Sequence, residues 1–191
     1  MNQETQVQLN DKYIFGFWIY LMTDLLVFAV LFAAYAVLGN NTFGGITIKE
    51  IFDPPYVLAE TLILLTSSFT CGLAMLAVFR NQKNQTIFWF FITFLLGLSF
   101  LIMEIHEFRK LLAEGASFQT SAFLSSFFTL VGTHGLHITA GLLWIIISML
   151  ELWYRGLNPF VTSKLIRLSL FWHFLDIVWI FIFTFVYLIR V

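Results

Sequence analysis

Long apolar segments alternate with short polar ones along most of the chain. A membrane-spanning α-helix takes about 20 apolar residues, and five segments reach that length, at about residues 15–38, 57–79, 86–107, 123–150 and 168–189. Apolar residues run continuously in these segments, whereas the strands of a transmembrane β-barrel alternate apolar and polar positions. The pattern therefore predicts an all-α polytopic membrane protein, a bundle of five transmembrane helices.

Polar breaks rich in Gly, Pro and Asn separate these segments and are typical of turns; they lie at residues 40–45, 53–55, 80–84, 115–120 and 155–159. Residues 1–14 form a polar N-terminal segment, and residues 15–191 are predicted to be a single transmembrane domain. The first apolar segment is too long for the apolar part of a signal peptide, and only Lys12 precedes it as a basic residue. We therefore expect it to be a retained helix.

Basic residues predict the orientation of the bundle, since cytoplasmic loops of membrane proteins carry an excess of Lys and Arg. If the N-terminus is cytoplasmic, six of the ten basic residues lie inside: Lys12, Arg80, Lys83, Arg155, Lys164 and Arg167. The other four lie outside: Lys49, Arg109, Lys110 and Arg190. This modest bias predicts a cytoplasmic N-terminus and a periplasmic C-terminus.

Composition excludes several other classes of protein. Hydrophobic residues make up 60 % of the chain and charged residues 11 %, against about 25 % charged residues in soluble domains, so a water-soluble globule is excluded. The chain has three Pro and one Cys, which excludes collagen and a disulfide scaffold. Cys71 has no partner for an intrachain disulfide. A net charge of −1 gives no indication of nucleic-acid binding.

The acids and histidines within the predicted spans are the candidate functional residues. They are Asp24, Glu60, Glu104, Asp176, His106, His134, His137 and His173, with Glu107 at the edge of a span. An ionised side chain in the bilayer centre costs several kcal/mol, so intramembrane acids indicate a function or a hidden partner. No Lys or Arg lies within the spans. The acids must therefore be protonated, bound to His, or hydrogen-bonded to hydroxyl and ring groups.

Depth along the spans, at about 1.5 Å per residue, divides these residues into two layers. Asp24, His137 and Asp176 form a central layer, with His134 and His173 just off it. Glu60 and Glu104 form an outer layer with His106 nearby. We expect Glu60 and Glu104 to pair across the second and third helices, so that one of them holds a proton or both share His106. We expect the central layer to be structural and lipid-organising rather than catalytic.

Other interpretations of the buried residues stay open. They could form interhelical hydrogen bonds, worth about 0.6 kcal/mol each, a proton path within this chain, or a contact with lipid or a partner helix. A metal or haem site is disfavoured. His134 and His137 lie on the same side of one helix, whereas haem takes axial ligands from opposite faces. Glu104 and His106 lack the spacing of a di-metal carboxylate motif.

Four segments together resemble subunit III of the haem–copper oxidases: residues 15–24 (FGFWIYLMTD), 104–108 (EIHEF), 132–137 (GTHGLH) and 171–179 (FWHFLDIVW). With their spacing they cover nearly the whole chain from residue 14. Within the family the chain resembles the five-helix form. The segments around Glu60 and at 156–173 are most similar to cytochrome o (bo-type) ubiquinol oxidases, followed by aa-type menaquinol oxidases. Asp24 falls where many members carry a carbodiimide-reactive Glu.

The resemblance implies a cofactor-free accessory subunit in a multi-pass arrangement in the bacterial inner membrane. The haems and copper would belong to partner subunit I, which oxidises quinol, reduces O2 to water and pumps protons. Subunits II and IV and phospholipids would be further partners. The chain would aid stability, proton uptake and lipid binding. The alternatives are subunit III of an aa-type menaquinol or cytochrome c oxidase, a stand-alone proton or solute transporter, and a membrane haem protein.

Overall fold

A computed structural model describes residues 3–38, 54–113 and 122–188 of the chain. Within these ranges all regular structure is helical, and five helices are long and apolar enough to cross a membrane. They are α1 (Gln3–Leu38), α3 (Pro54–Phe79), α4 (Lys83–Ala113), α5 (Ala122–Arg155) and α6 (Pro159–Ile182), which continues as the π-helical segment η1 (Phe183–Leu188). The predicted all-α fold with five transmembrane helices is confirmed.

The helices extend beyond the apolar segments that predicted them. The hydrocarbon core is about 30 Å thick, but the headgroup regions add 10–15 Å in which polar residues can stay helical. α1 therefore takes in most of the polar segment 1–14. α6 begins at Pro159 instead of about residue 168, because Asn158 caps it: the Asn158 Oδ1 atom accepts a hydrogen bond of 2.9 Å from the Val161 backbone N–H.

Two of the predicted turns are confirmed, and each contains a residue with positive φ. Asn81, at φ 56°, ends α3, and Gly156, at φ 69°, ends α5. Asn and Gly are the residues that tolerate this conformation best, and it closes helix ends by bonding the last free carbonyl groups. The Asn81 N–H accordingly donates to the Val78 carbonyl at 2.9 Å. The turns predicted at 40–45 and 115–120 lie outside the described residues.

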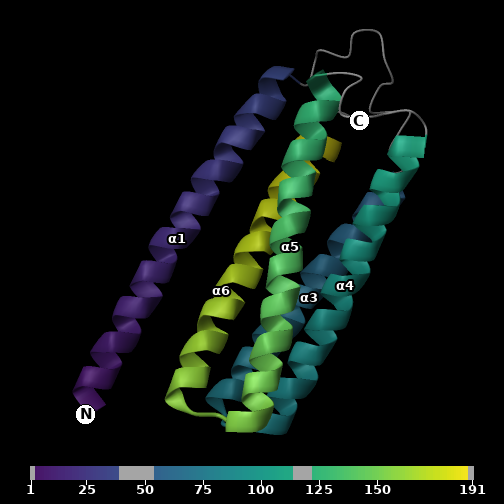
Figure 1. Ribbon diagram of the computed structural model, residues 1–191. Helices are drawn as coiled ribbons and strands as arrows, with labels where there is room; N and C mark the ends of the chain where they lie inside the picture. Colours follow the sequence, from purple (N-terminus) through teal and green to yellow (C-terminus); the bar gives the residue numbers. More distant parts are fainter. Residues whose placement is uncertain (1–2, 39–53, 114–121, 189–191) are drawn as a thin grey trace.

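The described helices lie side by side with their axes roughly aligned, and α6 lies between α1 and α3 (Figure 1). Among the described elements, α1 packs mainly on α5 and α6. It therefore lies at the side of the bundle. The start of α1, the α3–α4 turn and the α5–α6 turn share one end, where Lys83 Nζ donates to the Trp153 carbonyl at 2.9 Å. η1 points to the other end. It stays a prediction that the end with the start of α1 faces the cytoplasm. Two of the basic residues used for that prediction, Lys49 and Arg190, lie outside the described residues.

Trp172 of α6 lies at the centre of the packing between α3, α4 and α5. A Cβ atom added at Gly97 would lie 2.7 Å from the indole ring, and one added at Gly141 would lie 3.0 Å from it. The indole N–H donates to Ser67 Oγ at 3.1 Å. The two glycines therefore leave the space that this large side chain occupies.

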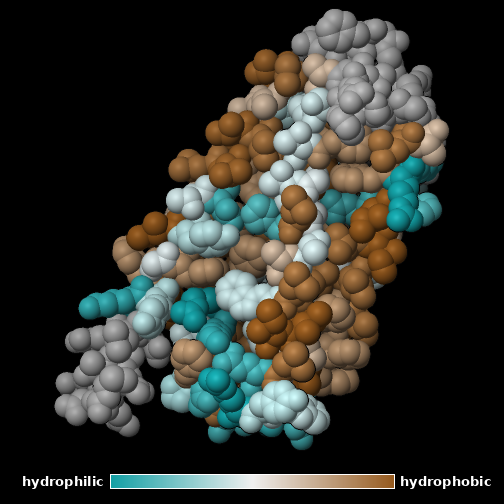
Figure 2. Space-filling view, viewed as in Figure 1, coloured by the Kyte–Doolittle hydropathy of each residue, from teal (hydrophilic) through white to brown (hydrophobic). Residues whose placement is uncertain are grey.

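Apolar side chains cover much of the length of the bundle surface (Figure 2). Hydrophilic side chains gather at the end where α1 begins. At that end Lys164 Nζ lies 2.8 Å from a Glu151 carboxylate oxygen, and Arg155 contacts the same carboxylate at 3.5 Å. Apolar sides with charged residues near an end are what a bilayer requires of a spanning bundle.

Candidate functional site

Asp24 and His137 form a contact between α1 and α5. His137 Nε2 lies 3.4 Å from Asp24 Oδ2, and His137 Nδ1 lies 2.7 Å from the Thr133 carbonyl oxygen. Because a carbonyl only accepts, Nδ1 carries a proton. The Nε2–Oδ2 contact then needs one further proton, held by the imidazole or by the carboxyl group. Tyr20, one turn earlier on α1, also interacts with Asp24. The prediction that Asp24 and His137 share a layer is confirmed.

Asp176 lies at a different interface, between α6 and α3. Ser68 Oγ lies 2.7 Å from His173 Nδ1, and Ser68 also interacts with the Asp176 carboxyl group. Asp176 is 7 % exposed, and its Oδ1 atom has no hydrogen-bond partner among the described residues. The predicted central layer is therefore two separate groups, one at α1–α5 and one at α3–α6. Ser68 was not among the candidate residues that the sequence indicated.

His134 lies in an aromatic part of the core. It is fully buried, and neither ring nitrogen has a hydrogen-bond partner among the described residues. Its ring stacks on Trp179 with centroids 5.3 Å apart, and Phe28 and Phe100 meet it edge-on at 6.3 and 6.2 Å. Among the described residues His134 therefore interacts through ring packing and not through hydrogen bonds, one helical turn from the Asp24–His137 contact.

Three buried acids form a cluster between α3 and α4. Glu60, Glu104 and Glu107 are 0, 2 and 7 % exposed, and Glu60 interacts electrostatically with both of the others. The prediction that Glu60 and Glu104 come together is thus confirmed. Sequence reasoning placed Glu107 at the edge of a span, although its i+3 spacing from Glu104 puts both on one side of α4. The Tyr187 hydroxyl donates to Glu107 Oε2 at 3.4 Å.

His106 is not part of this acidic cluster, and its predicted place beside Glu60 and Glu104 is wrong. It is exposed on α4, because two residues along an α-helix turn a side chain about 200° away from Glu104. Glu104 packs against α5, where a Cβ atom at Gly135 would lie 2.9 Å from its Oε1 atom. Both carboxyl oxygens of Glu60 and of Glu104 lack hydrogen-bond partners among the described residues. Ionising such groups in a dry interior is costly.

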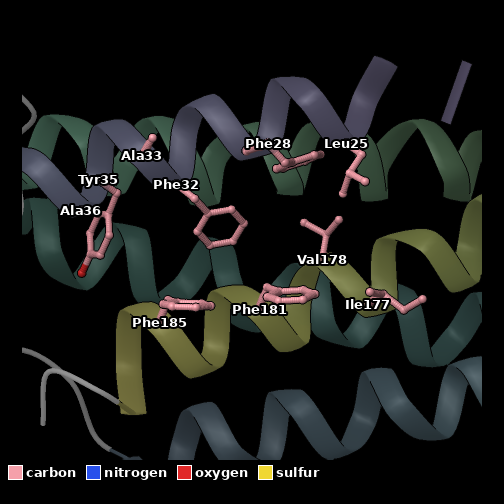
Figure 3. Close-up of a pocket in the computed structure, with 11 residues that line it drawn as sticks. Leu25, Phe28, Phe32, Ala33, Tyr35, Ala36, Ile177, Val178, Phe181 and Phe185 are labelled. Carbon is pink, nitrogen blue, oxygen red and sulfur yellow. The ribbon is translucent and has the colours of Figure 1, made fainter. Parts of the chain in front are cut away.

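An apolar groove of about 630 Å³, here named the α1–α6 groove, lies between α1 on one side and α6 with η1 on the other. Phe28 and Phe32 of α1 face Phe181 of α6 and Phe185 of η1 across it (Figure 3). Sequence reasoning did not predict this groove. The sequence feature that could have predicted it is a row of small side chains on one side of α1, which leaves space beside the helix: Ala29, Ala33 and Ala36.

Chemically, these groups offer proton binding, hydrogen bonding and apolar contact. No three His, Cys, Asp or Glu side chains among the described residues are placed to hold a metal ion. The four histidines are distributed over separate surroundings: the Asp24 contact, the Ser68 contact, the aromatic core and the surface. The polar groups of the described residues are thus divided among several helix interfaces.

The model of the family described as cytochrome c oxidase subunit III matches residues 2–191. The chain belongs to this family. The match takes in all five helices and every candidate residue, so the resemblance carried by four short motifs extends over the full length. The expected assignment to the subunit III family of the haem–copper oxidases is confirmed.

Curated relatives cover the same span. The chain is 59 % identical over 175 residues to a cytochrome bo(3) ubiquinol oxidase subunit 3 of Pseudomonas aeruginosa, covering 92 % of this chain and 84 % of the relative. It is 48 % identical to a quinol oxidase subunit 3 of Bacillus spizizenii, covering 97 % and 91 %. It is 47 % identical to a cytochrome c oxidase subunit 3 of Bacillus sp. PS3, covering 91 % and 84 %.

Proposed function

We propose that the chain is the accessory subunit III of a quinol-oxidising, proton-pumping terminal oxidase in the bacterial inner membrane. Its main contact would be subunit I, which would carry the haems and copper and reduce O2 to water. Subunits II and IV would complete the complex. The observation that carries the proposal is the match over nearly the whole chain to an oxidase subunit 3 at 59 % identity.

Ubiquinol is the electron donor that the comparisons favour for the complex. The identity of 59 % to a ubiquinol oxidase subunit exceeds the 48 % and 47 % to quinol oxidase and cytochrome c oxidase subunits of Bacillus. The last two values are nearly equal although the donors differ. The sequence identity between subunit III chains therefore depends only weakly on the electron donor of their complexes. The donor has to be tested on the complex itself.

A structural and lipid-organising role in the complex fits the described geometry. The α1–α6 groove has the size and the apolar lining that suit acyl chains. The Asp24–His137 contact holds α1 against α5 beside that groove, since Phe28 lines the groove and packs on the His137 ring at 5.3 Å. We infer that the chain keeps lipid in place and supports the stability and proton uptake of subunit I.

Purification from native membranes through a tag on this chain tests the proposal. We expect haem-bearing subunits to co-purify in fixed ratio and the preparation to consume O2 with ubiquinol. The isolated chain should show no Soret absorption. A Soret band that stays with the isolated chain, or proton or solute transport by the chain alone in liposomes, would contradict the proposal and favour the alternative of a membrane haem protein or a transporter.

A further inference from the structure

A second groove, of about 340 Å³, opens on the surface of the bundle between α3 and α6. It differs from the α1–α6 groove in having a serine, a histidine and an aspartate among its lining residues. Ser68 of α3 and His173 and Asp176 of α6 line it together with apolar residues and a glycine, which are Leu65, Phe69, Gly72 and Leu73.

The polar groups of this groove cannot all be satisfied by one another. Ser68 has one hydroxyl proton, which it gives either to His173 Nδ1, 2.7 Å away, or to Asp176. If Asp176 receives it, His173 donates to Ser68 and its Nε2 atom is left as an acceptor. If His173 receives it, Asp176 must hold a proton of its own to contact Ser68. In both arrangements Asp176 Oδ1 lacks a donor, in agreement with its missing partner.

These groups lie near the middle of the membrane. His173 is at the centre of the span Pro159–Leu188, and Ser68 is at the centre of the span Pro55–Phe79. Lipid tails at that depth offer no hydrogen-bond donor. The nearest basic side chains on α6 have other contacts: Lys164 pairs with Glu151 at 2.8 Å, and Arg167 lies over the Tyr13 ring at 5.8 Å.

The surface around Asp176 also permits close approach of another backbone. Ser68 and Gly72 are four residues apart on α3, the small-xxx-small spacing at which membrane helices pack closely. A Cβ atom added at Gly72 would meet nothing within 4 Å among the described residues. The chain itself therefore does not use this glycine for its own packing.

We propose that the α3–α6 groove is the docking site for one transmembrane helix of another oxidase subunit, which places a hydrogen-bond donor side chain at Asp176. This inference rests on the proposed function, since it takes the partner from the same complex. The polar lining distinguishes the occupant from lipid, because an acyl chain would leave Asp176 Oδ1 unsatisfied. Lipid suits the α1–α6 groove instead, whose lining is apolar apart from the hydroxyl group of Tyr35.

Photo-crosslinking in the assembled complex tests the occupant. A benzophenone amino acid replaces Phe69, which lines the groove and is 66 % exposed, or Leu136, a control on α5 that is 72 % exposed near mid-span. We expect the Phe69 position to give an adduct that mass spectrometry identifies as another subunit of the oxidase, and the Leu136 position to give mainly lipid adducts. Adducts from position 69 only to lipid, or only to a second copy of this chain, would overturn the proposal. An equal subunit yield from position 136 would also overturn it.

Two substitutions test the docking contact itself. Gly72→Leu fills the groove from a position with open space, and Gly16→Leu is its control, because a Cβ atom there also meets nothing within 4 Å. We expect Gly72→Leu to lower the amount of this chain retained per haem during detergent purification by about threefold, the size of one lost interhelical contact. Asp176→Asn, which keeps hydrogen-bonding capacity, should retain more chain than Asp176→Leu.

The abundance of each variant in the membrane, measured by immunoblot, separates docking from folding. Normal abundance and unchanged retention of Gly72→Leu would overturn the inference. Failure of the proposed function gives a different result, because the wild-type chain would then not co-purify with haem-bearing subunits at all. If the wild type co-purifies and Gly72→Leu does so equally well, only the docking site is wrong.

Discussion

Asp24 of α1 and His137 of α5 approach to 3.4 Å, and this polar contact joins α1 to α5. The contact lies beside the α1–α6 groove, because Phe28 belongs to both. α1 packs on α5 and α6 only along one side, so a polar contact there has a larger share in holding α1 than it would have for a central helix. The consequences for the oxidase are testable.

Replacing Asp24 should affect the lifetime of the complex before its chemistry. Asp24→Ala removes the partner of His137 Nε2 and should cost about 1–3 kcal/mol, so the complex should lose activity faster over repeated turnovers. Asp24→Asn should change the initial rate little. The measurement is quinol-dependent O2 uptake per haem, followed over many turnovers. A fully assembled Asp24→Asn complex without initial activity would show that the carboxyl group takes part in catalysis or its proton path.

The acidic cluster should tolerate loss of charge better than loss of shape. Glu104→Gln keeps hydrogen-bonding capacity and volume, whereas Glu104→Ala leaves a cavity beside Glu60, and we expect a cost of about 2–4 kcal/mol. The measurement is the thermal midpoint of the detergent-solubilised complex. His106→Ala, on the exposed side of the same helix, is the control and should leave the midpoint unchanged. Equal losses from Glu104→Gln and Glu104→Ala would show that ionisation of Glu104 stabilises the fold.

Crowding the Trp172 site should destabilise the bundle. In Gly97→Ala the new methyl group would lie 2.7 Å from the indole ring, so helices or ring must move, at a cost of about 1–3 kcal/mol. Gly16→Ala, with open space, is the matched control. Thermal aggregation of the purified chain or complex gives the comparison, and identical behaviour of the two variants would contradict the packing described around Trp172.

Filling the α1–α6 groove should displace lipid without disturbing assembly. Ala33→Trp places a large ring in the groove, and Leu26→Trp, at an exposed position outside the lining, is its control. We expect native mass spectrometry to find fewer phospholipids retained on the Ala33→Trp complex than on the control. Lipid retention that does not differ between the two would show that the groove is not a lipid site.

Sequence reasoning located the helices and the depth of the polar residues because both depend on local properties. Apolar length decides whether a segment spans the bilayer, and rise per residue decides depth, so Glu60 and Glu104 could be assigned to one level. The direction of a side chain around its helix is also local, and on that ground His106 could have been separated from Glu104. The expectation that His106 belongs to the outer layer was wrong because it considered depth along the helix and not the direction in which the side chain points.

What the sequence by itself determined is the five-helix membrane fold, the depth of its buried acids and, through four motifs, the oxidase subunit III family. Only the tertiary structure decided which helices face each other: that Asp24 meets His137 while Asp176 meets Ser68, that Glu107 joins Glu60 and Glu104, and where the two grooves lie. The physical reason is that residues at one depth on five helices can pair in many ways. The choice among those pairings depends on packing between distant segments, such as the fit of Trp172 against Gly97 and Gly141.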